Sequence, residues 1–406
     1  MTKSRSPHLK ILEERLGITA FEYQDFAWRW AFSVRNSSPR KTRALLFYKT
    51  GAGKTYTAAG MLHQLGYDKA VVIAPPSTHE SWKSVMAKLD IETELISHAK
   101  FRQKGYRLSR TTPVIADEFH LFGKNTGAGY VKLQKLADHL DAPIILNSAT
   151  PNYNDAERCY CIMRILNPQN FKGGIMDFIA RYCETEPNFF GIMPIVTGFR
   201  NHKDAADFLS SQPCVFYVED DVDYSIIEEH IQLGTPQAFS QMGLDTRHNF
   251  ERIMASQMEA RHRLKRIKLL TVDERRLDPT VATHLHRLLN AAKGKVLIFS
   301  ASEKIAKAAA YSLNIGWRVL TVTGRDNTAS KTSTIRAFIK DPDAQVLVGT
   351  AALATGTDGL DRVCDTLIIL DDTDDDAMRR QLIGRIMPRG ANAQKAKDKR
   401  VYRVNV

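Results

Sequence analysis

The strongest constraint on the fold is an apolar run that leads through a glycine-containing loop into a helix. Residues 44–48 are apolar or aromatic and predict a buried strand. Residues 55–65 carry apolar side chains at helical spacing, and the loop before them contains Gly51 and Gly53. A phosphate-binding loop requires this order of strand, loop and helix, because the N–H groups of the loop and of the helix N-terminus point at phosphate oxygens.

The loop residues predict a site for a nucleotide and Mg²⁺. Lys54 would place a positive charge near the β and γ phosphates, and the Thr55 hydroxyl would ligate Mg²⁺. The backbone contacts would come from Thr50, Gly51, Ala52 and Gly53. The full pattern G-x-x-x-x-G-K-[ST] begins with glycine, where this chain has Tyr48. The alternative interpretation is a chance turn before a helix.

A pair of adjacent acids gives the second strong signal. A short apolar run, residues 113–116, predicts a strand that delivers Asp117 and Glu118 at its carboxyl end. We expect Asp117 to hold Mg²⁺, directly or through water, and Glu118 to orient and deprotonate the attacking water. The alternative is an ordinary solvated turn.

Hydroxyl residues follow a further predicted strand, residues 144–147. Ser148 and Thr150 lie just past its end, with Ala149 between them. Small hydroxyl residues at a strand end can relay hydrogen bonds between a nucleotide site and a neighbouring domain. Taken alone, this segment predicts only a turn.

An aromatic-rich helix pattern precedes the loop. We expect Phe21, Phe26 and Trp30 to pack in the core. Gln24 is different, because its carboxamide offers both a donor and an acceptor and so matches the edge of adenine.

The charge of the chain favours a polyanionic partner. Of its 406 residues, 57 are Lys or Arg and 45 are Asp or Glu, a formal net charge of +12. Nucleic acid is the simplest partner for this charge, and a merely basic enzyme is the alternative. Two segments could contact a phosphate backbone or be solvated surface: the loop 101–110 and a predicted helix at 250–270.

The cysteines and the apolar runs bear on the compartment. The five cysteines form no C-x-x-C pair, and we expect them to be reduced. The polar, basic N-terminus lacks the apolar core of a secretory signal. No apolar run approaches membrane-spanning length, so we expect a cytoplasmic chain with no membrane partner.

Taken together, these segments resemble the superfamily-two helicases and translocases. The glycine loop, the acidic box ending at His120, and Ser148 to Thr150 match motifs I, II and III of that family in order and spacing. Residues 72–77, with Trp82, look like motif Ia of the Swi/Snf-like branch, which places Ser77 at nucleic acid. The resemblance also implies that Tyr23 and Gln24 contact adenine, and that His120, Ser148 and Thr150 couple the two lobes.

Alternating strand and helix patterns resume in the second half of the chain. Strands are predicted at 295–299, 318–322, 345–349 and 366–370, with helices at 302–313 and 330–340. This alternation implies a second parallel sheet covered by helices. Residues 296–300 resemble family motif IV.

Two further motifs complete the resemblance. Residues 350–358 look like motif V, which implies that Thr350 faces nucleic-acid phosphates and that Gly356 and Asp358 face the nucleotide. Residues 381–390 resemble motif VI, Q-x-x-G-R-x-x-R. They imply contacts to the nucleotide from Gln381 and catalytic roles for Arg385 and Arg389. Pro388 occupies the position of the last family arginine, so Arg389 lies one residue out of register.

The resemblance implies an α/β chain with two tandem RecA-like parallel-sheet domains and an ATP cleft between them. Domain 1 would span residues 1–222, including a helical segment after motif III. Domain 2, with a helical linker segment, would span residues 223–406. ATP and Mg²⁺ are the implied cofactors.

The implied function is an ATP-dependent DNA helicase or translocase acting on forked or junction DNA. The chain resembles compact phage or bacterial branch-migration enzymes. This resemblance implies that it acts in a bacterial or phage-infected cell. Three alternatives stay open: a duplex DNA translocase without strand separation, an RNA helicase, and a nucleic-acid-binding module with a degenerate ATPase fold. Protein partners are unknown.

Overall fold

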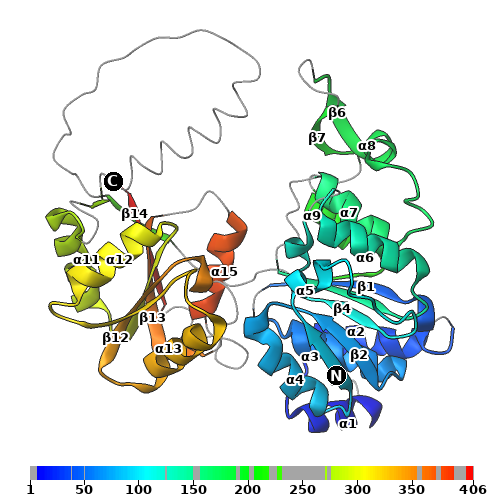
Figure 1. The fold of residues 1–406 in the computed structure, drawn as a ribbon, viewed down its shortest axis with the longest axis horizontal. Coiled ribbons are helices and arrows are strands. Elements are labelled where there is room, and N and C mark those ends of the chain that lie inside the picture. The colour runs from blue at the N-terminus through cyan, green and yellow to red at the C-terminus, as the bar shows by residue number, and fades with distance from the viewer. Residues whose placement is uncertain are drawn as a thin grey trace, which may run out of the picture. The chain divides into compact units, whose positions relative to one another are not determined.

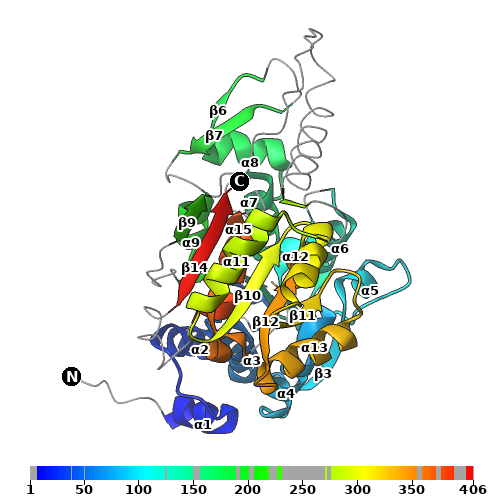
Figure 2. The same ribbon diagram turned by 90° about the vertical axis from the view of Figure 1, so that its left-hand side faces the viewer.

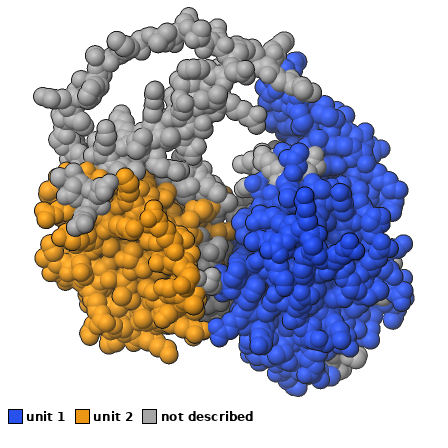
Figure 3. All heavy atoms as spheres, viewed as in Figure 1, with its two compact units in different colours: residues 1–220 blue, residues 221–406 orange. Residues whose placement is uncertain are grey.

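The computed structural model forms two compact units, residues 1–220 and 221–406 (Figure 3). It describes residues 7–37, 39–49, 51–123, 126–149, 156–188, 193–200, 205–218, 226–230, 270–271, 276–353, 359–371, 376–387 and 399–405. Each unit has its own six-stranded sheet. The predicted domain boundary at residue 222 stays a prediction.

Unit 1 is built on a six-stranded sheet with the order β3-β2-β4-β5-β1-β8 (Figure 1). Every neighbouring pair is parallel. The carboxyl ends of all six strands therefore meet at one edge, where open parallel sheets bind ligands. The strands are β1 (Arg43–Tyr48), β2 (Lys69–Ile73), β3 (Glu92–Ile96), β4 (Val114–Ala116), β5 (Ile144–Ser148) and β8 (Val215–Val218).

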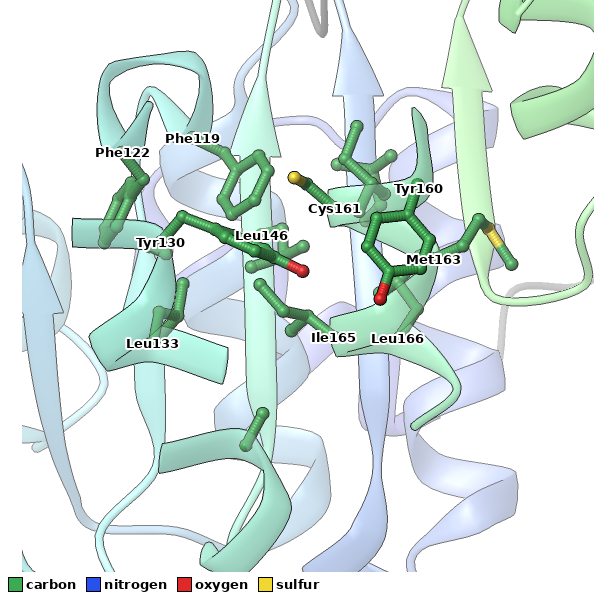
Figure 4. Packing of buried hydrophobic residues seen from close by; sticks show 14 of the residues in the cluster. Phe119, Phe122, Tyr130, Leu133, Leu146, Tyr160, Cys161, Met163, Ile165 and Leu166 are labelled. Atoms are coloured by element: carbon green, nitrogen blue, oxygen red, sulfur yellow. The ribbon is translucent and has the colours of Figure 1, made fainter. Parts of the chain in front are cut away.

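Helices cover both faces of this sheet because its central strands are buried on both sides. One apolar cluster joins the sheet to α1 (Pro7–Leu16), α2 (Glu22–Val34), α3 (Lys54–Leu65) and α4 (His79–Ala87). A second cluster joins the other face to α5 (His98–Arg102), α6 (Ala128–His139), α7 (Ala156–Leu166), α8 (Ile175–Tyr182) and α9 (Ala205–Ser210). Figure 4 shows part of this second cluster, where Leu146 of β5 packs between Tyr130 and residues of α7.

The short elements of unit 1 lie outside the main sheet. An antiparallel pair, β6 (Cys183–Glu186) and β7 (Ile195–Phe199), forms a separate two-stranded sheet beside α8. The 3₁₀ helices are η1 (Pro39–Lys41), η2 (Pro76–Thr78) and η3 (Phe119–Phe122).

Unit 2 has a second six-stranded parallel sheet, with the order β11-β12-β10-β13-β14-β9. The prediction of two parallel α/β sheets is therefore confirmed. The pattern missed the two strands at one edge, β9 and β14. The strands are β9 (Ile226–His230), β10 (Lys295–Ser300), β11 (Arg318–Val322), β12 (Ala344–Gly349), β13 (Cys364–Asp371) and β14 (Arg400–Asn405).

Helices also cover both faces of the unit 2 sheet. Figure 2 shows α11 (Pro279–Ala291) and α12 (Glu303–Leu313) on one face, and both join the same apolar cluster. On the other face lie α13 (Thr328–Lys340), α14 (Leu360–Val363) and α15 (Asp376–Ile386), with the 3₁₀ helix η4 (Ala351–Leu353).

One prediction about the core is wrong. Phe26 is 60% exposed and Phe21 is 42% exposed, although both lie in or beside the apolar helix α2. Phe21 stacks on Tyr23, and Phe26 packs edge-on against Phe216 at the end of the sheet. The pattern failed here because Trp28 and Ala27, rather than these two rings, occupy the buried face of α2.

Three further sequence predictions concern the cysteines, membrane-spanning segments and a basic helix. The cysteines are all free, and four of the five are buried. In the described ranges, no helix combines the length and the apolar character needed to cross a membrane. The predicted basic helix at 250–270 lies outside the described residues except for Leu270.

Candidate nucleotide-binding site

The glycine loop connects β1 to α3, and its backbone depends on glycine. Gly51 has φ 83° and Gly53 has φ 76°, both in the left-handed region that side chains rarely adopt. A Cβ on Gly53 would also lie 2.6 Å from Nε2 of Gln24. The sequence therefore keeps these positions free of side chains, as close approach of a phosphate to the backbone requires.

Lys54 begins α3, and its ammonium group lies over the loop. Its Nζ donates hydrogen bonds of 3.1 Å to the Tyr48 carbonyl and 3.3 Å to the Lys49 carbonyl. Thr55 follows in the first turn of α3 and is half-buried. The structure thus brings a lysine and a hydroxyl to the helix N-terminus, where a polyphosphate would meet positive charge.

Tyr48 has a structural reason to replace the first glycine of the loop pattern. It is the last residue of β1, and its side chain is fully buried. The ring packs edge-on against Tyr23 at 5.1 Å, and its hydroxyl donates to the Tyr23 carbonyl. Burial raises the pKa of Tyr48, so the hydroxyl stays protonated as a donor. The side chain thus anchors α2 to the strand that leads into the loop.

The two residues predicted to contact adenine both contact the loop. Gln24 is 2% exposed, accepts a hydrogen bond from the Phe21 N–H, and donates to the Gly53 carbonyl and Thr57 Oγ1. The Tyr23 hydroxyl donates to the Ala52 carbonyl at 3.1 Å, and burial raises the pKa of Tyr23 to about 12. Both residues therefore shape the loop, and their contact with adenine stays a prediction.

Asp117 follows β4 directly and is held on two sides. Its N–H donates to the Ile73 carbonyl, which continues the pairing of β4 with β2. Its Oδ2 accepts a 2.9 Å hydrogen bond from the Trp82 indole in α4. Burial and then the neighbouring Glu118 carboxylate raise the pKa of Asp117, whereas Trp82 and Lys54 lower it. The Lys54 charge thus favours the ionised form of this carboxylate.

Glu118 has a strained backbone. Its φ of 47° and ψ of 56° place a residue with a Cβ in the left-handed region. Such conformations cluster at functional sites, because the surrounding structure must hold them in place. Its buried Oε2 accepts no hydrogen bond in the described part of the chain and lies 3.4 Å from Nδ1 of His120.

His120 connects the acidic pair to the next strand. Its Nδ1 lies 3.4 Å from Oγ of Ser148, the last residue of β5. Its carbonyl accepts a hydrogen bond from Arg158 in α7. Glu118, His120 and Ser148 are therefore brought together, whereas Thr150 lies outside the described residues. Ser77 is half-buried in η2.

Three residues that support this site, Trp28, Gly60 and His98, have no role predicted from the sequence. The Trp28 indole donates to the Thr57 carbonyl in α3, and a Cβ on Gly60 would meet its ring at 2.3 Å. His98 Nε2 donates to the Asp117 carbonyl at 2.9 Å, and burial lowers the pKa of His98 to about 4, so the ring is neutral. No local pattern predicts these contacts, because each joins distant segments.

Three predicted site residues lie in the described part of unit 2. Thr350 directly follows β12, is buried, and donates its N–H to the Val322 carbonyl. Gln381 and Arg385 lie on α15 and are both buried. Gly356, Asp358 and Arg389, like Thr50 in the loop, lie outside the described residues.

The unit 1 residues fit a nucleotide with Mg²⁺. The described residues contain no cluster of three or more His, Cys, Asp or Glu placed to hold a metal. Mg²⁺ in nucleotide sites uses one or two protein groups, with phosphates and waters for the rest. Asp117 and the Thr55 hydroxyl would be such groups, and the left-handed φ of Gly51 and Gly53 keeps Cβ atoms out of the loop that would hold the phosphates.

Comparisons with known proteins give three findings. Residues 280–390 match the family described as "Helicase conserved C-terminal domain", a segment within unit 2. No curated protein is significantly similar to the chain. A solved structure, the Sulfolobus solfataricus SWI2/SNF2 ATPase core in complex with dsDNA, is similar over 96% of this chain and 88% of that chain, with 14% identity and a TM-score of 0.42. A likeness at this level carries no functional conclusion.

Proposed function

We propose that the chain is an ATPase that couples ATP hydrolysis to movement on nucleic acid. One observation carries this proposal. The glycine loop with Lys54 and the acids Asp117 and Glu118 follow two parallel strands, β1 and β4, which are separated only by β5. The match of residues 280–390 to the helicase C-terminal domain supports it.

Each unit 1 residue has a defined chemical task in this proposal. Lys54 and the α3 N-terminus would neutralise charge on the phosphate oxygens. Thr55 and Asp117 would hold Mg²⁺, which offsets phosphate charge when it is bound. Glu118 would accept the proton of the attacking water. The strained backbone of Glu118 sets the position from which its side chain extends.

For the other predicted residues we propose the roles expected from the sequence. Gly356, Asp358 and Gln381 would contact the nucleotide, and Arg385 and Arg389 would act in catalysis. The residues that would couple the two lobes are His120, Ser148 and Thr150. Domains 1–222 and 223–406 are part of the same proposal. Ser77 and Thr350 would contact the nucleic-acid backbone. Contacts to phosphate carry little sequence information, so binding should be sensitive to salt and largely independent of sequence.

For the nucleic acid, we propose DNA with forks or junctions, unwound or branch-migrated by the motor. The net charge of +12 supports a polyanionic track. A second candidate is a duplex translocase that does not separate strands. It is favoured by Trp82, which stands in the segment similar to motif Ia of the Swi/Snf-like branch and contacts Asp117.

The deciding experiment is the ATPase rate at fixed low salt without nucleic acid and with single-stranded DNA, duplex DNA, forked or four-way DNA, and RNA. We expect the strongest stimulation with forked or four-way DNA. Equal stimulation by plain duplex would favour the second candidate. Stimulation by RNA alone would overturn the DNA assignment, and no turnover under any condition would overturn the ATPase.

Lys54→Ala provides the matched test of the site. We expect its turnover to fall about 100-fold or more, because the substitution removes a positive charge that would lie near the reacting phosphates. Lys69→Ala is the control, since Lys69 is an exposed lysine at the amino end of β2 whose ammonium forms an ion pair with Glu92. Normal turnover in Lys54→Ala would exclude the glycine loop as the site.

A further inference from the structure

Asn147 is a buried amide with no hydrogen bond. Its side chain is 0% exposed, and neither Nδ2 nor Oδ1 has a partner within the part of the chain that the structure describes. Buried polar side chains in native proteins are almost always paired, so an exception requires a physical explanation. No role was assigned to this residue from the sequence.

The sheet places Asn147 between the two halves of the proposed site. It lies near the carboxyl end of β5, between β4 and β1. In register, Leu146 is opposite Ala116, so the next residues, Asn147 and Asp117, occupy neighbouring strands at the same level. Neighbouring strands are about 5 Å apart. Asn147 is also directly opposite Leu46 of β1.

The alternation along β5 sets the face to which Asn147 belongs. Leu146 packs in the cluster of α6 and α7 (Figure 4), and Ile145 packs in the cluster of α3. Side chains alternate along a strand, so Asn147 shares the face of Ile145 and α3. Leu46 opposite it lies in that same cluster. The amide is therefore buried on the face of the sheet that α3 covers, next in register to Asp117.

We propose that Asn147 is a positioning residue whose amide pairs with the water that Asp117 and a bound Mg²⁺–nucleotide order at this edge. The inference rests on the proposed function. An unpaired buried amide destabilises the chain without nucleotide, and an occupied site would supply its missing partner. Proteins keep such locally unfavourable groups mainly at functional sites.

The test compares wild type with Asn147→Leu, which replaces the amide by an apolar group of similar size. Two quantities are measured: the melting temperature without nucleotide, and the Kd for a non-hydrolysable ATP analogue with Mg²⁺ by calorimetry. We expect the melting temperature to rise by about 2–4 °C, because the unpaired group is removed. We expect the Kd to rise about three- to tenfold, the loss of one hydrogen bond.

A structural amide would give the opposite pattern. A lower melting temperature with unchanged Kd would overturn the inference. Gln64→Met is the matched control, because Gln64 is a buried amide ten residues after Lys54 on α3 and should leave the Kd unchanged. If Asn147→Leu does not fold, Asn147→Ser carries the test, and an unchanged Kd there also overturns it.

The design separates this inference from the proposed function. If wild type binds no nucleotide, both the proposed function and the role of Asn147 are excluded. If wild type binds the analogue and Lys54→Ala does not, the site stands, and an unchanged Kd in the Asn147 variants then removes only the role of Asn147.

Discussion

The indole Nε1–H of Trp82 donates a 2.9 Å hydrogen bond to Oδ2 of Asp117, and both side chains are buried in unit 1. Trp82 lies on α4, after β2, whereas Asp117 follows the neighbouring strand β4. A rigid, buried donor fixes the carboxylate in one orientation. A residue from another segment of the chain therefore orients the carboxylate that we propose for Mg²⁺. Metal ligands are commonly oriented by such supporting hydrogen-bond partners.

Trp82→Phe removes this donor and keeps most of the ring. We expect the Mg²⁺ concentration for half-maximal ATPase activity to rise about tenfold, because loss of a hydrogen bond to a charged group costs about 1.5–3 kcal/mol. A magnesium titration at saturating ATP measures the shift.

Trp28→Phe is the control for that titration. Trp28 is also buried, but its indole donates to the Thr57 carbonyl rather than to a carboxylate. It should lower stability without changing the magnesium midpoint. Equal midpoints in wild type and Trp82→Phe would show that the indole does not orient the metal-binding carboxylate.

Glu118→Gln tests the general base. The change preserves size and the backbone strain but removes the proton acceptor, so we expect turnover to fall about 10²–10⁴-fold. The Kd for the ATP analogue should stay within about threefold of the wild-type value, because the variant loses only the negative charge of one carboxylate near the site. Glu92→Gln, at an exposed position in β3, should be normal in both assays. Wild-type turnover in Glu118→Gln would mean that another group takes the proton.

Tyr48→Gly would restore the glycine of the full loop pattern, and we expect it to weaken the protein. The ring is fully buried against Tyr23, and losing a buried aromatic side chain costs about 3–5 kcal/mol. Tyr48→Phe, which loses only the bond to the Tyr23 carbonyl, should cost about 1 kcal/mol. Urea unfolding followed by circular dichroism measures both. If Tyr48→Gly is as stable as wild type, the departure from the pattern has no packing reason.

The sequence predicted much of the fold because its signals are local. The run 44–48 became β1, and the acids after residues 113–116 did follow a strand. The contacts of Trp82 with Asp117 and of Gln24 with Gly53 join segments 35 and 29 residues apart, and periodicity carries no information about such pairs. The exposure of Phe26 was mispredicted because the apolar pattern did not show that Ala27 and Trp28, rather than this ring, occupy the buried face of α2.

Edge strands illustrate the same limit. The pattern missed β14, which pairs with β13 and with β9 from the start of unit 2. Its six residues, Arg400 to Asn405, include two arginines and an asparagine, whereas the central strand β10 is an almost continuous apolar run. A short segment of mixed polarity is a weak signal, and only the neighbours in the sheet decide its structure.

Gly53→Ala should damage the loop through two separate effects. The backbone has φ 76°, which costs a residue with a Cβ about 1–2 kcal/mol. The added Cβ would also meet Nε2 of Gln24 at 2.6 Å, so the buried amide must move and lose its bonds to the Gly53 carbonyl and Thr57. We expect a lower urea midpoint and at least tenfold weaker binding of the ATP analogue. Gly105→Ala is the control, because nothing lies within 4 Å of a Cβ there. Unchanged binding in Gly53→Ala would mean that nucleotide does not approach this backbone.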